Sequence, residues 1–219
     1  MPLHSLASLP HGAYLGLWRL TETVDELLPL LPYPTVYQAL YPAGRDPTRA
    51  AQWAAGRLLV HALLLKVTTT PATLANDANG RPYLPTLPDY AVSLSHSGEW
   101  VAGIVAPQGR VGIDVELIRG KAQKLASRFL SEAERADAGD DATKYSLYWS
   151  AKETLYKLHS RRGLVFKEQL LLDPFWLREA GELTAHLLLK NSRSQHQLMY
   201  LRPAPGYVLT YCVESLSEL

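Results

Sequence analysis

Two carboxylates lie on alternate residues of a short apolar run that follows a turn-forming segment. The run extends from Val111 to Glu116, and its acids are Asp114 and Glu116. Side chains two residues apart on a strand leave the same face, so both acids point toward one place. Like charges repel there unless a proton or a cation lies between them, and a hard divalent ion, Mg²⁺ before Ca²⁺, suits the position. Alternatively, the two acids are the solvated face of an ordinary strand end.

A helix is predicted from Thr143 to His159, and it brings further charged groups. Its expected inner face holds Leu147, Ala151, Thr154 or Leu155, and Leu158. Glu153 and Lys157 are four residues apart and share another face, where they form either a surface ion pair worth about 0.3 kcal/mol or part of a reactive site. Lys152 is turned roughly 100° from Glu153. Lys152 therefore either contacts a ligand of Glu153 and Lys157 from another side, or has a structural role.

A second long helix is predicted from Pro47 to about Lys66. Asp46 is the expected N-cap, with proline at the first helical position. Apolar residues recur along one expected face, at Ala50, Ala54, Leu58, Ala62 and Leu65. Arg49 and Arg57 lie roughly 80° apart around this helix, so they serve one groove or are two solvated arginines.

The remaining pattern indicates antiparallel strands joined by turns. Strands are expected at 13–20, 90–98, 100–106 and 111–116, and an antiparallel meander from the apolar runs near 164–172, 183–189, 197–202 and 207–213. A proline-punctuated loop with one short helical piece is expected at 29–47. Helices are expected up to Phe129 and from a capping box at Ser131, whose partner is Glu134. We predict an α+β fold with two halves, residues 1–108 and 109–219, each with antiparallel strands and one main helix.

Composition excludes several classes of function. The net charge of +1 argues against a nucleic-acid-binding surface. The single cysteine, Cys212, excludes an internal disulfide, offers no zinc site and is expected to pack in the core. No basic leader and no long apolar run is evident, so we expect a cytoplasmic protein that does not enter a membrane.

Three ordered motifs carry a resemblance to a known family. They are the run from Val111 to Glu116, the segment from Arg128 to Glu134, and the segment from Trp149 to Lys157. Together they resemble the signature of the 4′-phosphopantetheinyl transferases, in particular the Sfp-type branch, whose single chain holds two similar halves. Two further segments, Gly80 to Pro82 and Ser95 to Gly98, look like that branch's coenzyme A contacts. The resemblance covers roughly residues 45–166.

The resemblance implies a reaction and a role for each matching residue. The phosphopantetheine arm of coenzyme A would be transferred to a serine of an apo acyl or peptidyl carrier protein, with release of adenosine 3′,5′-bisphosphate. The two halves would be related by a pseudo-twofold arrangement with the active site between them, the first contacting coenzyme A and the second supplying metal and catalytic residues. A monomer is expected, in fatty acid, polyketide or nonribosomal peptide biosynthesis.

The implied site residues fall into three groups. The catalytic residues would be Glu153 as general base, Lys157 and Asp114. Those holding Mg²⁺, with Mn²⁺ as an alternative, would be Asp114, Glu116 and Glu153. Coenzyme A would be met by Arg49, Arg81, Ser95, His96, Lys152 and Lys157, although spacing leaves open whether Arg49 or Arg57 is the matching arginine. Glu134 is either functional or simply the helix cap.

Other readings of the same residues stay open. A metal-dependent hydrolase of coenzyme A or another pyrophosphate would use the same acids and lysines with water as the nucleophile. A serine hydrolase at Ser95 or Ser97 with His96 lacks the usual relay and a G-x-S-x-G segment. A non-enzymatic carrier-binding protein would keep the basic residues Arg161 and Arg162, which either steer an acidic carrier protein or complement a helix C-terminus.

Overall fold

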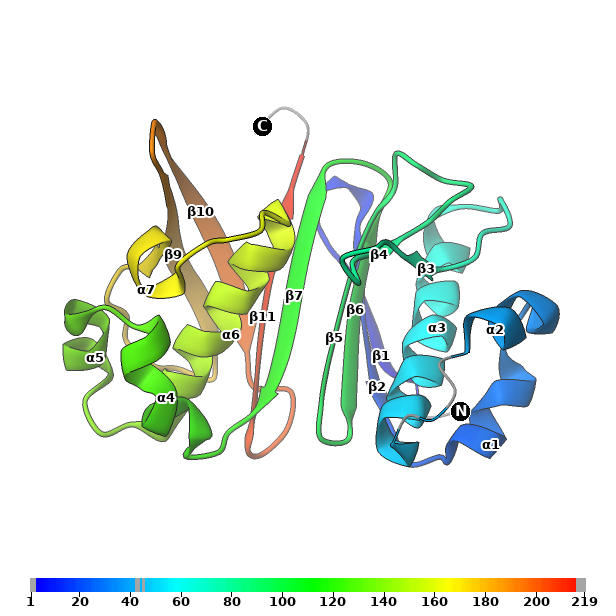
Figure 1. Ribbon diagram of the computed structural model, residues 1–219, viewed down its shortest axis with the longest axis horizontal. Helices are drawn as coiled ribbons and strands as arrows, with labels where there is room; N and C mark the ends of the chain where they lie inside the picture. The colour runs from blue at the N-terminus through cyan, green and yellow to red at the C-terminus, as the bar shows by residue number, and fades with distance from the viewer. Residues whose placement is uncertain (1–2, 42–43, 45, 216–219) are drawn as a thin grey trace. The chain divides into compact units, whose positions relative to one another are not determined.

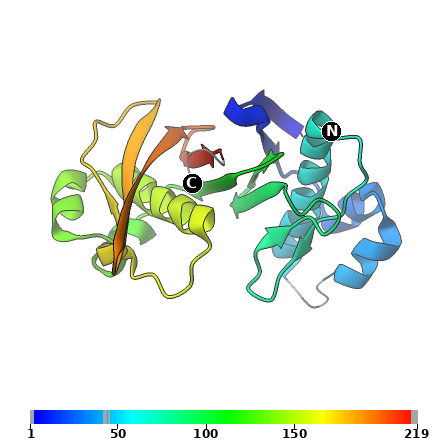
Figure 2. The same ribbon diagram turned by 90° about the horizontal axis from the view of Figure 1, so that it is seen from above.

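The computed structural model describes residues 3–41, 44 and 46–215, and it confirms the α+β class (Figure 1). The chain divides into two compact units, Met1–Val111 with Val213–Leu219, and Gly112–Cys212. Each unit combines a sheet that contains antiparallel pairs with one long helix. In both views of the ribbon, the long helix lies along one face of the sheet of its own unit (Figures 1 and 2).

The first unit is built on a four-stranded antiparallel sheet. Its strands are, in spatial order, β1 (Leu3–Ser8), β2 (Tyr14–Arg19), β6 (Trp100–Ala106) and β5 (Ala91–Ser97). The strands expected at 13–20, 90–98 and 100–106 are confirmed, whereas β1 was not predicted because only Leu3 and Leu6 in it pack against the core. Strand β5 ends at Ser97, one residue before the end of the predicted segment.

Short elements connect the strands of the first unit. They are η1 (Pro10–Gly12), α1 (Val24–Leu27), η2 (Leu28–Leu30), α2 (Pro34–Leu40), β3 (Ala75–Asn76) and β4 (Pro82–Tyr83). The segment expected as a loop at 29–47 thus includes η2, α2 and the start of the long helix, while its residues 42, 43 and 45 lie outside the described part of the chain.

The long helix of the first unit is α3 (Pro47–Val67). Asp46 caps it as predicted, because its side chain accepts hydrogen bonds from the backbone of Thr48 and Arg49. The predicted inner face was wrong at its far end, where Leu65 is 81% exposed. Ala50 and Ala54 are buried as predicted, and the buried surface extends around the helix to Ala51, Ala55, Leu59, Leu63 and Leu64.

The second unit has a five-stranded sheet and the second long helix. The strands are, in spatial order, β7 (Arg110–Leu117), β11 (Tyr207–Glu214), β10 (Ser192–Leu201), β9 (Ala180–Leu189) and β8 (Leu170–Leu172). The helices are α4 (Lys121–Phe129), α5 (Glu132–Ala138), α6 (Ala142–His159) and α7 (Phe166–Gln169). The meander is confirmed, except that the run at 164–172 begins with the single-turn helix α7 before it becomes a strand. Cys212 is buried, as expected.

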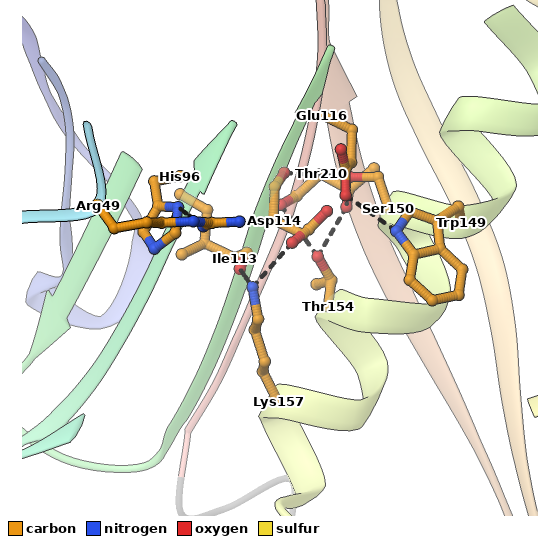
Figure 3. Close-up of polar contacts among 10 residues, drawn as sticks. All are labelled: Arg49, His96, Ile113, Asp114, Glu116, Trp149, Ser150, Thr154, Lys157 and Thr210. Carbon is orange, nitrogen blue, oxygen red and sulfur yellow. Dashed lines mark hydrogen bonds and ion pairs between the residues drawn. The ribbon is translucent and has the colours of Figure 1, made fainter. Parts of the chain in front are cut away.

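Close packing of α6 on β7 depends on Gly112. A Cβ atom added at Gly112 would collide with the backbone carbonyl oxygen of Thr154 and approach the backbone nitrogen of Leu158. Buried hydroxyls then tie the helix to the sheet (Figure 3). Ser150 and Thr154 lie 2.9 Å and 2.7 Å from the Thr210 hydroxyl, and Ser150 also donates to the backbone oxygen of Asp114. The helix is therefore held at a fixed height above the acidic strand.

We find no helix in the described residues that has both the length and the apolar character needed to cross a membrane.

Candidate active site

The predicted pairing of Asp114 and Glu116 on one strand is found on β7, beside α6. Asp114 is 4% exposed, and its Oδ1 accepts a hydrogen bond of 2.8 Å from Nζ of Lys157. The same ammonium also donates to the backbone oxygen of Ile113 at 3.0 Å (Figure 3). The ion pair between Lys157 and Asp114 links the middle of the strand to the last turns of the helix.

Glu153 lies on α6 one turn before Lys157. Burial and the negative charge of Asp114 raise the pKa of Glu153 to about 7, with a further contribution from Glu116, while the ammonium of Lys157 acts in the opposite direction. Burial is the largest of these causes, and the two neighbouring acids add to it because like charges disfavour a further ionised carboxylate. A carboxyl group poised near neutral pH is suited to accept a proton.

The oxygen chemistry of this group fits a hard divalent cation. Carboxylate oxygens are the ligands that Mg²⁺ prefers, and a bound cation would offset the negative charge of Asp114 and Glu116 that raises the pKa of Glu153. Within residues 3–41, 44 and 46–215, however, no three His, Cys, Asp or Glu side chains are placed so that they hold a metal ion together. Mg²⁺ does not need three protein ligands, because this ion is usually held by one or two carboxylates together with substrate phosphates and water.

Lys152 and Glu134 lie apart from these acids, in the interior of the second unit. Nζ of Lys152 is 2.8 Å from Oε2 of Glu134 and donates to the backbone oxygens of Phe129 and Phe166. The Lys152 side chain is 0% exposed. This placement favours the structural alternative for Lys152 over a coenzyme A contact.

Glu134 completes the predicted capping box and also binds residues outside α5. Its Oε2 accepts a hydrogen bond from the backbone N–H of Ser131, and the Ser131 hydroxyl accepts one from the backbone N–H of Glu134. Its Oε1 accepts a hydrogen bond from the backbone N–H of Leu172. Together with the pair to Lys152, these bonds connect α5, α6 and β8. The capping box was visible in the sequence, whereas the partner 18 residues away was not.

In the first unit, Arg49 and His96 lie side by side (Figure 3). Nη1 of Arg49 is 3.1 Å from Nδ1 of His96. A guanidinium can only donate, so Nδ1 of His96 must accept, which leaves the proton of the neutral imidazole on Nε2. Both side chains are exposed, so the guanidinium of Arg49 is accessible to an anionic ligand.

The other expected contacts of the first unit are placed differently. Ser95 is only 9% exposed and, as the neighbour of exposed His96 on a strand, faces the opposite side of the sheet. Arg81 is exposed and follows a turn that Asp77 fixes by accepting from the backbone of Asn79 and Arg81. The structure therefore brings Arg49 and His96 together and leaves Ser95 in the interior.

The structure distinguishes the two arginines of α3. Arg57 is 4% exposed, lies 3.6 Å from the ring centroid of Trp53, and donates to the side chain of Asn76 and the backbone of Trp53. Arg57 thus secures β3 against α3, and exposed Arg49 is the arginine available to a ligand. The helical spacing of the two residues did not reveal this difference, which depends on tertiary contacts.

Comparison with known proteins assigns the family. A model described as the 4′-phosphopantetheinyl transferase superfamily matches residues 110–212, and one described as the 4′-phosphopantetheinyl transferase N-terminal domain matches residues 42–106. The chain belongs to the 4′-phosphopantetheinyl transferase superfamily. Within that superfamily it is of the Sfp type, as the following relatives indicate.

Three relatives illustrate the similarity. The 4′-phosphopantetheinyl transferase Sfp of Bacillus subtilis (strain 168) is 33% identical over 138 residues, which cover 61% of this chain and 59% of the relative. The 4′-phosphopantetheinyl transferase psf-1 of Bacillus pumilus is 30% identical over 141 residues, which cover 62% of this chain and 58% of the relative. The 4′-phosphopantetheinyl transferase AcpT of Escherichia coli (strain K12) is 32% identical over 117 residues, which cover 50% of this chain and 57% of the relative. The chain therefore spans less than two thirds of the length of these relatives.

Proposed function

We propose that this protein transfers the 4′-phosphopantetheine group of coenzyme A to a serine hydroxyl of an apo acyl or peptidyl carrier protein. The observation that carries the proposal is the group formed by Asp114, Lys157 and Glu153 on β7 and α6. It combines a buried acid, an ammonium and a carboxyl group with a pKa near neutrality. Attack on a phosphorus atom of a pyrophosphate needs charge neutralisation, positioning and removal of one proton, and this group supplies the means for each.

In this proposal, Glu153 is the general base. It takes the proton from the carrier serine as the serine oxygen forms its bond to phosphorus, while the bond from phosphorus to the oxygen of adenosine 3′,5′-bisphosphate breaks. Lys157 is held by Asp114 and the Ile113 carbonyl, and its ammonium stabilises the negative charge that develops on the leaving group.

A divalent cation completes the proposal. Mg²⁺, when bound, would neutralise pyrophosphate charge, and Asp114, Glu116 and Glu153 are the residues among which its one or two carboxylate ligands would be found. Mn²⁺ is an alternative with the same oxygen ligands. Arg49, His96 and Arg81 would contact the phosphates of coenzyme A from the first unit, which has the role of nucleotide binding. We leave Ser95 and Lys152 out of this ligand set because both side chains are buried.

The experiment that tests this function weighs unmodified carrier proteins after incubation with the protein, coenzyme A and Mg²⁺. Transfer adds about 340 Da to the carrier, and EDTA as well as Asp114→Ala should abolish the gain if the cation acts at these residues. Cleavage of coenzyme A without any gain in carrier mass would instead establish a hydrolase. The panel should include acyl carrier proteins of fatty acid and polyketide synthesis and a peptidyl carrier protein, which also identifies the preferred partner.

A further inference from the structure

The indole of Trp149 contacts one of the acids of the candidate site. Its Nε1 lies 2.9 Å from Oε1 of Glu116, and the N–H group donates because indole has no acceptor (Figure 3). The two residues are 33 positions apart, on α6 and β7. A hydrogen bond to an ionised carboxylate is stronger than one between neutral groups, so it restricts the rotamers of Glu116.

Two aromatic rings hold Trp149 in place. The ring of Phe129, from α4, meets the indole at a centroid distance of 5.0 Å and an interplanar angle of 74°. The ring of Phe166, from α7, lies 5.8 Å away at an angle of 31°. Edge-to-face and tilted contacts at such distances are favourable, so the indole has a defined orientation before any ligand binds.

The same two phenylalanines are bound through their backbones by Lys152. Its ammonium donates to the carbonyl oxygens of Phe129 and Phe166 and is neutralised by Glu134. The buried ion pair therefore fixes the two segments whose rings enclose Trp149. A continuous series of contacts runs from Glu134 through Lys152, the phenylalanines and Trp149 to Glu116.

We propose that Trp149 is a positioning residue that orients Glu116 as a ligand for the divalent cation. The inference rests on the proposed function, since it assumes that Glu116 binds the cation. An ionised carboxylate has about four lone-pair sites, so accepting the indole N–H leaves it able to coordinate metal. Partners in this outer position typically change metal affinity or activity about tenfold to a hundredfold when they are removed.

The test compares the Trp149→Phe variant with the parent protein by Mn²⁺ titration, monitored by electron paramagnetic resonance with coenzyme A present and no carrier. Phenylalanine retains an aromatic ring and removes the N–H donor. We expect the dissociation constant for Mn²⁺ to rise about tenfold to a hundredfold. The matched control is Trp176→Phe, because Trp176 is 87% exposed and lies outside the site, and it should leave Mn²⁺ affinity unchanged.

Transfer kinetics provide the second readout. Trp149→Phe should raise the Mg²⁺ concentration needed for half-maximal activity by the same factor, with kcat restored within about twofold at saturating Mg²⁺. A purely structural role would not be rescued by the cation. If Trp149→Phe fails to fold, Phe166→Leu takes its place, since it loosens the aromatic contact while keeping the indole, and it should give a smaller shift in the same direction.

Unchanged Mn²⁺ affinity in Trp149→Phe, in a protein whose parent binds Mn²⁺ and modifies carriers, would overturn this inference alone. A loss of kcat that saturating Mg²⁺ does not restore would also overturn it. Absence of Mn²⁺ binding by the parent protein would overturn the metal site of the proposed function, and this inference with it.

Discussion

Lys152 and Lys157 are five residues apart on α6 and pair with different acids in different surroundings. Lys157, with a 25% exposed side chain, binds Asp114, whereas fully buried Lys152 binds Glu134. Their spacing puts them on different sides of the helix, as the sequence predicted. The sequence also left two roles open for Lys152, a ligand contact and a structural role. The choice could not be made from the sequence, because it depends on the carbonyls of Phe129 and Phe166, which reach Lys152 only in the folded chain.

Removing the ammonium of Lys152 should destabilise the protein strongly. Lys152→Met leaves Glu134 buried without its counter-charge, and we expect a loss of about 3–5 kcal/mol in the free energy of unfolding, measured by urea denaturation. The control is Arg202→Met, which removes an ion pair to 82% exposed Glu179 and should cost less than about 1 kcal/mol. A raised KM for coenzyme A with unchanged stability in Lys152→Met would show a ligand contact instead.

Replacing Glu153 should separate activity from stability. In Glu153→Gln the general base is lost, so we expect kcat of transfer to fall about 10²- to 10⁴-fold. The melting temperature measured without metal should not decrease, because the substitution removes repulsion from Asp114 and Glu116. Glu168→Gln, on the exposed surface of α7, is the control and should retain full activity. Normal transfer by Glu153→Gln would assign proton removal to another group.

At the level of elements, both long helices and most strands follow from local patterns. Asp46 marks the start of α3, and Ser131 with Glu134 marks the start of α5, since caps and periodicity act over a few residues. The buried face of α3 was less predictable, because leucines occur on several sides of the helix and the sheet decides which of them are covered. Strand β1 has too few buried apolar residues to be recognised.

Gly112 should be irreplaceable at the crossing of β7 and α6. In Gly112→Ala the added methyl group meets helix backbone, which cannot rotate away, so we expect a loss of at least 1–3 kcal/mol in unfolding free energy, as for overpacked cores. Gly120→Ala is the matched control, because a Cβ atom there has nothing within 4 Å. Urea denaturation of both variants provides the measurement. Equal stability of the two would mean that α6 shifts without cost.

The contact between α2 and α3 should make stability sensitive to acid. Nε2 of His61 lies 2.7 Å from the hydroxyl of Tyr37, and burial lowers the pKa of His61 to about 4. The unfolded chain takes up a proton near pH 6.5 but the folded chain only near pH 4, so unfolding free energy falls as pH decreases through that window. The contribution should be about 1–2 kcal/mol after allowance for partial solvent contact.

The variant His61→Gln tests this contact, because glutamine retains a hydrogen bond to Tyr37 without titrating. Thermal unfolding of both proteins from pH 7 to pH 4 should show a shallower decline for His61→Gln. Parallel curves would assign the acid sensitivity to other groups.

At the scale of the whole molecule, the two units repeat a plan that the sequence does not display as a repeat. Each has a sheet with one long helix on it, and the helices begin at Asp46 and Asp141, each of which accepts from two backbone N–H groups. Different residues satisfy the same packing requirement, so the likeness is visible in structure and only weakly in sequence. The class of fold and the meander of the second unit were accordingly predictable from the pattern of elements, whereas the distant pairings of β2 with β6 and of β7 with β11 were not.

A net charge of +1 implies that attraction to an acidic partner must be local. Arg161 and Arg162 are exposed directly after α6. If they steer the carrier protein, raising the salt concentration should increase the KM for carrier far more than the KM for coenzyme A. Arg161→Glu should reduce that salt dependence, and Lys190→Glu, an equal charge change in the turn between β9 and β10, should not. Identical salt effects on both substrates would rule out steering.

The order of the strands also bears on how the chain can be made in a cell. In the five-stranded sheet, β7 lies next to β11, although Tyr207 is 90 residues beyond Leu117. These two strands can therefore pair only after the ribosome has added the intervening residues. Pairing between strands so distant in the sequence closes slowly, because the entropy of a long loop must be lost first. The sheet that carries Asp114 and Glu116 is thus completed only when β11 has been synthesised.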